Sequence, residues 1–165
     1  MHSKVFIQTM SKIIQQSTIK SNNFFSAVQQ ERIVEAIRQM EKETSGELRV
    51  FVEKKNPLVD PVERAREIFR KLSMERTRHR NGVLLYVALK HHELALFGDE
   101  GIHQKVGAAY WKEAISQVVH HFKTKEPAEA IVLSIAQVGK TLKEKFPYDP
   151  KTDKNELPGN IIFGE

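Results

Sequence analysis

The sequence predicts one α/β domain, a small mixed β-sheet with helices on both faces in a three-layer sandwich. Two strand-like segments are separated by a helical stretch, which makes them parallel and joined by a right-handed crossover. A third strand-like segment follows the second after a short polar turn, which makes it antiparallel. Amphipathic helical stretches precede, separate and follow these strands, so the expected order is α-β-α-β-β-α-α.

The first helix is expected to begin after Ser26, because Ser26 and Gln29 form a capping-box pattern before a helical repeat. It should end near Ser45-Gly46, where glycine can adopt a left-handed C-cap. The apolar stripe of this helix is formed by Ile33, Ile37, Met40 and Thr44.

The first strand is the segment ELRVFVE, which begins at Glu47 and is followed by the breaking pair Asn56-Pro57. Its residues alternate in character along the chain. The two sets that should face opposite sides of the sheet are Leu48, Val50 and Val52, and Arg49, Phe51 and Glu53.

The second helix is expected to follow Asp60 as its cap, with Pro61 in the first turn and Glu63 closing a capping box. Its buried stripe should contain Val62, Ala65, Phe69 and Leu72. Its outer face should carry Arg64, Arg66, Arg70, Lys71, Arg76 and Arg78.

The second strand, GVLLYVAL, is a continuous apolar run, which is typical of a central strand covered on both faces. The turn KHHE and the returning strand LALFG complete a hairpin. Two helices follow, and the second begins at Pro127 and ends at Pro147. The first should bury Trp111, Ile115, Val118 and Phe122, and the second Ile131, Ile135, Val138, Leu142 and Phe146.

Three regions are expected along the 165 residues: a flexible N-terminal extension over 1–22, the α/β domain over 23–147 and an extended C-terminal tail over 148–165. No run approaches the roughly 18 apolar residues that span a membrane. The first residues also lack a secretory pattern, so the expected compartment is the cytoplasm.

Several kinds of chemistry are excluded by the residues that the sequence lacks. There is no cysteine, and there is no P-loop, dinucleotide fingerprint, HExxH or GxSxG pattern. The net charge of +5 is mixed with acidic residues along the helices. The arginine-rich stretch from Arg64 to Arg80 has a single aromatic residue, assigned to the buried stripe, so it offers no platform for base stacking. These features disfavour nucleic acid as a partner and leave anionic-membrane binding by the basic helix as an alternative.

Polar residues stand where the two parallel strands begin and where the third strand ends. Glu47 starts the first strand, Asn81 precedes the second, and Asp99 with Glu100 follows the third, so the topology places them at one sheet end. Carboxylate and amide oxygens are hard ligands that suit Ca²⁺ or Mg²⁺. The same residues also suit a strand-end charge, an Asn-Gly turn and a helix cap.

Several motifs, in order along the chain, resemble the TPM domain family, and most closely its short stand-alone bacterial members. They are ETSGELRVFVE, RNGVLLYVAL, LFGDEGIHQKVG with YWKEAI, and FPYDPKTDKNELPGNIIFG. The resemblance implies an α/β sandwich. It also implies links to an acid phosphatase of the thylakoid lumen connected with photosystem II repair, and to members associated with divalent cations.

The resemblance assigns Glu47 to the family's Thr/Ser-Gly-Glu segment, Asn81 to its Asn-Gly strand entry and Asp99 to its Gly-Asp-x-Gly turn. It ranks Asp99 above Glu100, because the turn pattern leaves the second position free. Secreted members continue with an acidic residue in a Leu-Thr-Asp-like segment, whereas this chain has QKVGAA. A ligand set taken from those members therefore lacks one carboxylate here.

The first expected function is divalent-cation binding, alone or with a weak phosphatase activity. In that activity the cation would polarise a phosphoryl oxygen, and Arg78 or Arg80 would offset the charge of the phosphate. The second is a non-catalytic protein-interaction module that uses Tyr148 to Glu165 or the arginine-rich helix. The identity of the metal, the substrate and the protein partner stays open at this stage.

Overall fold

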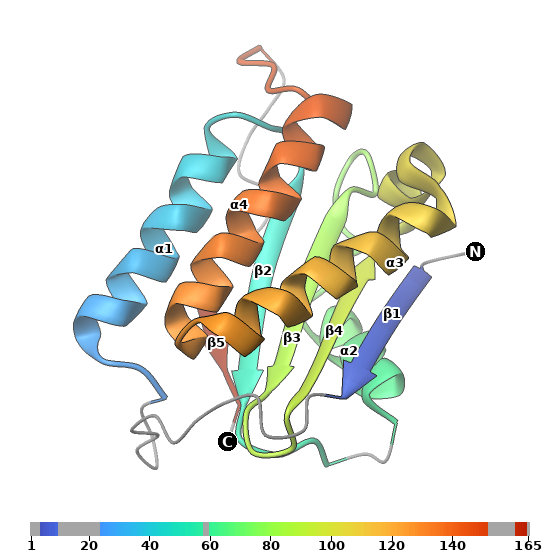
Figure 1. The fold of residues 1–165 in the computed structure, drawn as a ribbon. Coiled ribbons are helices and arrows are strands. Elements are labelled where there is room, and N and C mark those ends of the chain that lie inside the picture. The colour runs from blue at the N-terminus through green and yellow to red at the C-terminus, as the bar shows by residue number, and fades with distance from the viewer. Residues whose placement is uncertain (1–3, 10–23, 58–59, 152–160, 165) are drawn as a thin grey trace.

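The computed structural model describes residues 4–9, 24–57, 60–151 and 161–164. Its five-stranded mixed sheet has the order β1-β4-β3-β2-β5, with α1, α3 and α4 on one face and α2 on the other (Figure 1). The strands are β1 (Lys4–Thr9), β2 (Glu47–Glu53), β3 (Gly82–Ala88), β4 (Glu93–Gly98) and β5 (Ile161–Phe163). The helices are α1 (Ala27–Glu41), α2 (Pro61–Lys71), α3 (Glu100–Thr124) and α4 (Pro127–Lys145). The predicted α/β fold with helices on both faces is confirmed.

The strand pairing brings three chain segments to one end of the sheet. β2 and β3 run parallel from the pair Glu47 and Gly82, as the helical crossover through α2 requires. β3 and β4 form the predicted antiparallel hairpin, which pairs Val83 with Gly98. The starts of β2 and β3 therefore lie beside the end of β4, at the top of the sheet in Figure 1.

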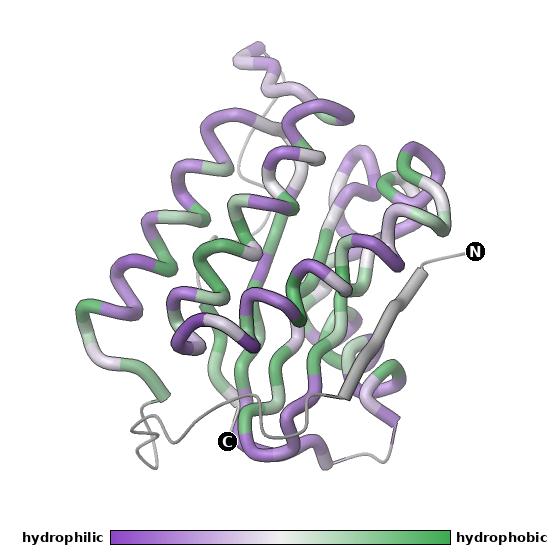
Figure 2. Tube along the Cα trace, viewed as in Figure 1, coloured by the Kyte–Doolittle hydropathy of each residue, from purple (hydrophilic) through white to green (hydrophobic). Residues whose placement is uncertain are grey.

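Two hydrophobic cores fill the layers, one on each face of the sheet. The alternation predicted for β2 is confirmed, since Val50 belongs to the core under α1, α3 and α4, whereas Phe51 belongs to the core on the α2 face. The central strand β3 contributes apolar residues to both cores, and all its residues are buried. Figure 2 shows hydrophobic residues along the central strands and alternating hydrophobic and hydrophilic residues along the helices, as expected where helices cover the two cores.

Both edges of the sheet are completed by short strands that the sequence analysis did not predict. β1 pairs antiparallel with β4, and it lies within the N-terminal extension expected over residues 1–22. β5 pairs parallel with β2, and it lies within the tail expected over 148–165. These additions satisfy backbone groups that β2 and β4 would otherwise present at open edges. The flexibility expected for the rest of the N-terminal extension lies outside the described residues.

The end of α1 differs from its prediction. The helix ends at Glu41, before Thr44, because Thr44 bonds to the last turn of α4 instead of continuing the helix. Thr44 Oγ1 donates to Leu142 O at 2.9 Å, and it accepts from Gly46 N at 3.0 Å. A Cβ on Gly46 would lie 2.8 Å from a Leu142 methyl carbon, so this glycine permits the close packing of the loop on α4.

α3 and α4 bury the predicted residues, but α2 departs from its predicted stripe, since Ile68 is buried with Ala65 and Phe69 whereas Val62 and Leu72 are half-buried. Asp60 Oδ1 caps α2 by accepting from Val62 N at 2.9 Å. α3 is interrupted at Gly107, whose φ of 79° separates a short first section from the long section across the sheet (Figure 1). Within the described part of the chain, no helix combines the length and apolar character that a membrane crossing requires.

Candidate functional site

Three loops meet at the sheet end where β2 and β3 begin, and we call residues 44–47, 77–82 and 98–101 the three-loop end. Their backbones are bonded directly to one another. Glu47 N donates to Asn81 O at 3.3 Å, Asp99 N to Gly82 O at 2.9 Å, and Gly101 N to Arg80 O at 2.8 Å. The structure thus brings together the three segments whose proximity the topology predicted.

Asp99 has a structural role at this end. Its Oδ1 accepts from Glu100 N at 2.8 Å, so it caps α3. Its carboxylate, only 1% exposed, is also held by Arg80 through Nε to Oδ2 at 2.7 Å and Nη2 to Oδ1 at 2.9 Å. Arg80 Nη1 reaches Glu100 Oε1 at 3.1 Å. One guanidinium therefore pairs with both acidic residues of the turn.

Arg80 is the main residue whose role the sequence analysis misjudged. We expected Arg78 or Arg80 to offset the charge of a phosphate, but Arg80 instead pairs with Asp99, and that hydrogen bond raises the pKa of Arg80. Its backbone has a φ of 50°, a left-handed conformation that costs about 1 kcal/mol or more outside glycine. Its side chain is 43% exposed whereas that of Asp99 is buried, so solvent reaches the pair from the Arg80 side.

Asn81 is the least satisfied polar residue of the three-loop end. Its side chain is fully buried, and neither Oδ1 nor Nδ2 has a hydrogen-bond partner within the described structure. Its backbone N–H donates to Thr77 Oγ1 at 3.2 Å, which fixes the loop at the entry to β3. Buried amide atoms without partners cost about 1–3 kcal/mol, so this position is a candidate for an additional ligand.

Glu47 is buried at the start of β2, on the sheet face that also carries Arg49. Burial lowers the pKa of Arg49, and the negative charge of Glu47 partly opposes that shift. Arg49 Nε has no hydrogen-bond partner among the described residues. Glu47 therefore offsets the charge of a buried guanidinium as well as marking the strand end.

The four predicted ligands, Glu47, Asn81, Asp99 and Glu100, share this sheet end without forming a carboxylate cage. Over residues 4–9, 24–57, 60–151 and 161–164, no three His, Cys, Asp or Glu side chains are grouped to hold a metal ion. A cation here would depend on the amide oxygen of Asn81 and on backbone carbonyls as well as on carboxylates.

A pocket of about 340 Å³ opens beside the three-loop end. His79 and Gly101 reach it from two of the loops, and Ser45 from the third. The remaining lining comes from α3 and the end of α4, namely Gln104, Lys105, Lys145, Phe146 and Pro147. We call this the basic pocket.

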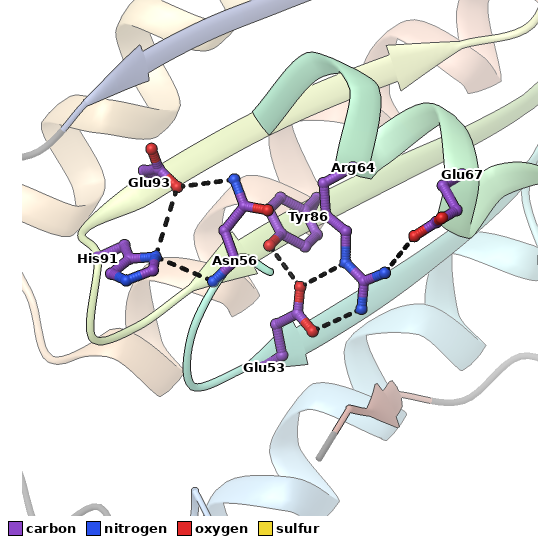
Figure 3. A network of polar contacts seen from close by, with 7 residues as sticks. All are labelled: Glu53, Asn56, Arg64, Glu67, Tyr86, His91 and Glu93. Atoms are coloured by element: carbon purple, nitrogen blue, oxygen red, sulfur yellow. Dashed lines mark hydrogen bonds and ion pairs between the residues drawn. The ribbon is translucent and has the colours of Figure 1, made fainter. Parts of the chain in front are cut away.

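The opposite end of the sheet, where β2 and β3 finish, carries a second polar cluster that we call the closed end (Figure 3). Its centre is Glu53, 2% exposed, which accepts from Arg64 Nε at 2.8 Å, from Arg64 Nη2 at 2.7 Å and from Tyr86 Oη at 2.5 Å. Arg64 also pairs with Glu67. Arg64 was expected on the outer face of α2, but it turns toward the sheet because the buried carboxylate of Glu53 needs a counter-ion.

The rest of the closed end ties two loops together. Asn56 N donates to His91 Nδ1 at 2.9 Å, and Asn56 Nδ2 donates to Glu93 Oε1 at 3.1 Å. Burial raises the pKa of Tyr86, and its hydrogen bond to Glu53 raises it further. Every side chain labelled in Figure 3 takes part in a contact, so this cluster is a completed structural network.

Comparisons with known proteins agree with the fold. The family model described as TPM domain matches residues 18–141. The NMR structure of the BA42 protein from the psychrophilic bacterium Bizionia argentinensis is similar, with a TM-score of 0.81 at 36% identity. The match covers 88% of this chain and 99% of that chain. No curated protein matches.

Proposed function

This chain belongs to the TPM domain family, and on that premise we propose that it binds a divalent cation, Ca²⁺ or Mg²⁺, at the three-loop end. The observation that carries the proposal is the side chain of Asn81, which is fully buried and without a hydrogen-bond partner in the described structure. The backbone oxygen of the next residue, Gly82, accepts a hydrogen bond from Asp99 N. The amide oxygen of Asn81 and the carboxylate of Asp99 therefore belong to adjoining segments. Such oxygens are the ligands that these cations prefer.

The proposed ligands are Asn81 and Asp99, with Glu47 and Glu100 supplying further negative charge at the same sheet end. Arg80 opposes binding, because a cation must share Asp99 with a guanidinium that already contacts both carboxylate oxygens. We therefore expect weak affinity, with a dissociation constant of about 10⁻⁴–10⁻³ M, as in low-affinity calcium modules.

A bound cation would supply Lewis acidity toward a phosphoryl oxygen, which is the chemistry that a weak phosphatase activity would use. The chain's own groups favour binding over catalysis. Asp99 already accepts hydrogen bonds from Arg80 and from the first turn of α3, which leaves about one of its roughly four lone-pair sites for a cation and none to accept a proton from water. The proposed function is therefore binding, and hydrolysis is a secondary expectation.

The proposal is tested by titrating Ca²⁺ and Mg²⁺ separately into the ¹⁵N-labelled protein and recording amide chemical shifts. We expect the amide signals of Glu47, Asn81 and Asp99 to shift together at millimolar cation. The cation should also raise the melting temperature, and a chelator should reverse that rise. Asp99→Asn should abolish the response while the asparagine oxygen can still cap α3.

The matched control is Glu93→Gln, which removes one negative charge at the closed end. It should leave the cation response unchanged. If wild-type protein shows no shifts and no melting-temperature change at millimolar Ca²⁺ or Mg²⁺, the proposal is wrong.

Fewer basic residues can serve the alternative function, binding to an anionic membrane, than the sequence suggested. Arg64 is engaged at the closed end, and Arg66 lies 3.9 Å from Glu63. Arg70 and Lys71 are exposed in α2, and Arg76 and Arg78 are exposed in the loop that follows it. Co-sedimentation with anionic vesicles at low salt tests whether these four are sufficient.

A further inference from the structure

Three lysines gather on the outer side of the closed end, on the loops that follow β2 and β3. Lys54 and Lys55 come directly after β2, and Lys90 begins the turn between β3 and β4. All three side chains are exposed. The two loops lie at the lower end of the sheet in Figure 1. We call these three residues the lysine tip.

Backbone hydrogen bonds fix the two loops of the lysine tip against each other. Leu89 N donates to Glu53 O at 3.0 Å, and Lys90 N donates to Lys54 O at 2.7 Å. These bonds continue the parallel pairing of β2 and β3 beyond the ends of the strands. The lysine stems are flexible, but the backbone positions from which they extend are therefore held close together.

The positive charge of the lysine tip is not balanced by the carboxylates nearby. Glu53 is buried and paired with Arg64, and Glu93, whose side chain is half-buried, accepts a hydrogen bond from Asn56. None of the three lysines forms an ion pair among the residues that the structure describes. The acidic groups of this end are thus engaged in the buried network, and the ammonium groups remain on the surface.

The three ammonium groups repel one another. The charge of Lys55 lowers the pKa of Lys90, and the charge of Lys54 lowers it further. Like charges held close together destabilise the folded state unless counter-charges offset them. A partner with several negative charges would offset all three at once, so this surface favours a multivalent anion.

The composition of the two loops favours protein carboxylates over nucleic acid or lipid. Residues 53–57 and 89–93 contain no Phe, Tyr or Trp on which a base could stack. The exposed large hydrophobic residues of the described structure are Val28 and Tyr148, outside these loops, so the lysine tip has no such side chain to insert into a bilayer. Three lysines are also fewer than the roughly four to eight basic residues of lipid-binding clusters.

We propose that the lysine tip docks an acidic segment of a partner protein, in which two or three Asp or Glu side chains pair with Lys54, Lys55 and Lys90. The partner binds exposed ammonium groups and leaves the buried hydrogen bonds of the closed end intact. Such pairing is weak at each lysine and sensitive to salt, and it contributes mainly to the rate and specificity of association. It requires no cation, so it does not depend on the proposed function.

The proposal is tested by titrating the ¹⁵N-labelled full chain with a capped hexaglutamate peptide at low salt, with a chelator present. The amide signals of Lys54, Lys55, Lys90 and His91 should shift together, and the shifts should fade as salt is added. A hexaglutamine peptide of the same length should cause no shift. An absence of shifts at these four residues with millimolar hexaglutamate would overturn the proposal.

Substitution of the lysines tests each contact. Lys54→Gln, Lys55→Gln and Lys90→Gln should each weaken hexaglutamate binding about two- to fivefold, as expected for one exposed ion pair. The triple variant should lose the shifts altogether. Because the lysines are exposed and repel one another, the triple variant should fold, and its melting temperature at low salt should exceed that of the wild type. Added salt should remove this gain.

The matched control is a second triple variant with Lys71→Gln, Lys112→Gln and Lys123→Gln. It removes the same charge from exposed lysines that are scattered over α2 and α3. It should weaken hexaglutamate binding less than about twofold, because charges beyond the Debye length are screened. Equal weakening by the two triple variants would overturn the proposal in favour of diffuse attraction to a basic protein.

Two further probes distinguish the acidic segment from other polyanions. Hexathymidylate should bind more weakly than hexaglutamate, and vesicles that contain phosphatidylserine should sediment the wild type and the lysine-tip triple variant equally. Tighter binding of hexathymidylate through the lysine tip would assign this surface to nucleic acid and overturn the proposal. Vesicle binding that only the lysine-tip variant loses would assign it to a membrane, with the same consequence.

Discussion

The two ends of the sheet both stabilise a buried carboxylate, but their surroundings differ. Each buries a carboxylate beside a strand terminus, and each pairs it with an arginine that contacts both oxygens. At the closed end Arg64 is only 12% exposed, and Tyr86 adds a third donor to Glu53. At the three-loop end Arg80 is 43% exposed, and the side chain of Asn81 beside it has no hydrogen-bond partner within the described structure.

This difference indicates which end of the sheet can bind a cation. Among the described residues of the closed end, no buried side-chain N or O atom lacks a hydrogen-bond partner, so a ligand would first have to break buried hydrogen bonds. The three-loop end combines an unsatisfied amide, a counter-ion accessible to solvent and an adjoining pocket. Ligands of open α/β sheets commonly bind at the carboxyl ends of parallel strands, yet here that end is closed and the amino end is the candidate.

The largest expected effect is at the closed end. Arg64→Met leaves the Glu53 carboxylate buried without its counter-ion, so the free energy of unfolding should fall by about 3–5 kcal/mol. Chemical denaturation measures this change. Arg70→Met, on the exposed side of the same helix, is the control and should change stability by less than about 0.5 kcal/mol. Equal effects would remove the distinction between a buried and a surface arginine.

Replacing each of two buried asparagines with leucine should change the free energy of unfolding in opposite directions. Asn81→Leu removes unsatisfied polar atoms, so it should stabilise the cation-free protein by about 1 kcal/mol and abolish the cation response. Asn56→Leu breaks a hydrogen bond to Glu93, so it should destabilise by about 1–3 kcal/mol. Denaturation midpoints of both variants test this contrast. Destabilisation by Asn81→Leu would show that this side chain is satisfied in solution.

Tyr86→Phe should cost about 1 kcal/mol at neutral pH, because one hydrogen bond to Glu53 is lost. The folded-state pKa of Tyr86 is raised, mainly by burial, so its stabilisation is present below the unfolded pKa of about 10. As the pH rises above that value, the unfolded state ionises first, and stability is lost by up to about 1.4 kcal/mol per pH unit.

Stability measured between neutral pH and pH of about 11 should therefore fall more steeply for wild type than for Tyr86→Phe. Burial also raises the pKa of Tyr110, but this residue is present in both proteins, so its contribution cancels. Parallel pH profiles would mean that the Tyr86 hydroxyl titrates equally in the folded and unfolded states.

The smallest expected effect concerns the counter-ion of the three-loop end. Arg80→Gln removes the competitor for Asp99, so cation affinity should rise by up to about fivefold, as expected for a partly exposed ion pair. The same titration of amide shifts measures it. Arg78→Gln makes the same charge change nearby and should alter the affinity much less. A similar rise in both variants would indicate a general reduction of positive charge.

Local patterns along the chain were sufficient to predict much of the fold. The alternation of β2, the apolar run of β3 and the short turn before β4 specify their pairing, because each depends on neighbouring residues. The caps at Ser26, Asp60 and Asp99 were also predictable, since a cap depends on a side chain and the next few backbone amides. The convergence of three loops followed from this topology.

Other features were decided only by tertiary packing. The inward turn of Arg64 depends on the buried carboxylate of Glu53 in another element, and nothing in the helical pattern of α2 indicates it. The edge strands β1 and β5 are stabilised by partners far away along the chain, so their own residues carry little signal.

The candidate site shows the same division. The sequence by itself determined which oxygens and charges stand at the three-loop end, because strand order places their loops there. Only the tertiary structure decided that Arg80 binds Asp99, that the Asn81 side chain is left without a partner among the described residues, and that Lys145 joins Lys105 in the basic pocket. Such pairings depend on side-chain directions and on burial between segments up to 102 residues apart, which short-range sequence patterns do not encode.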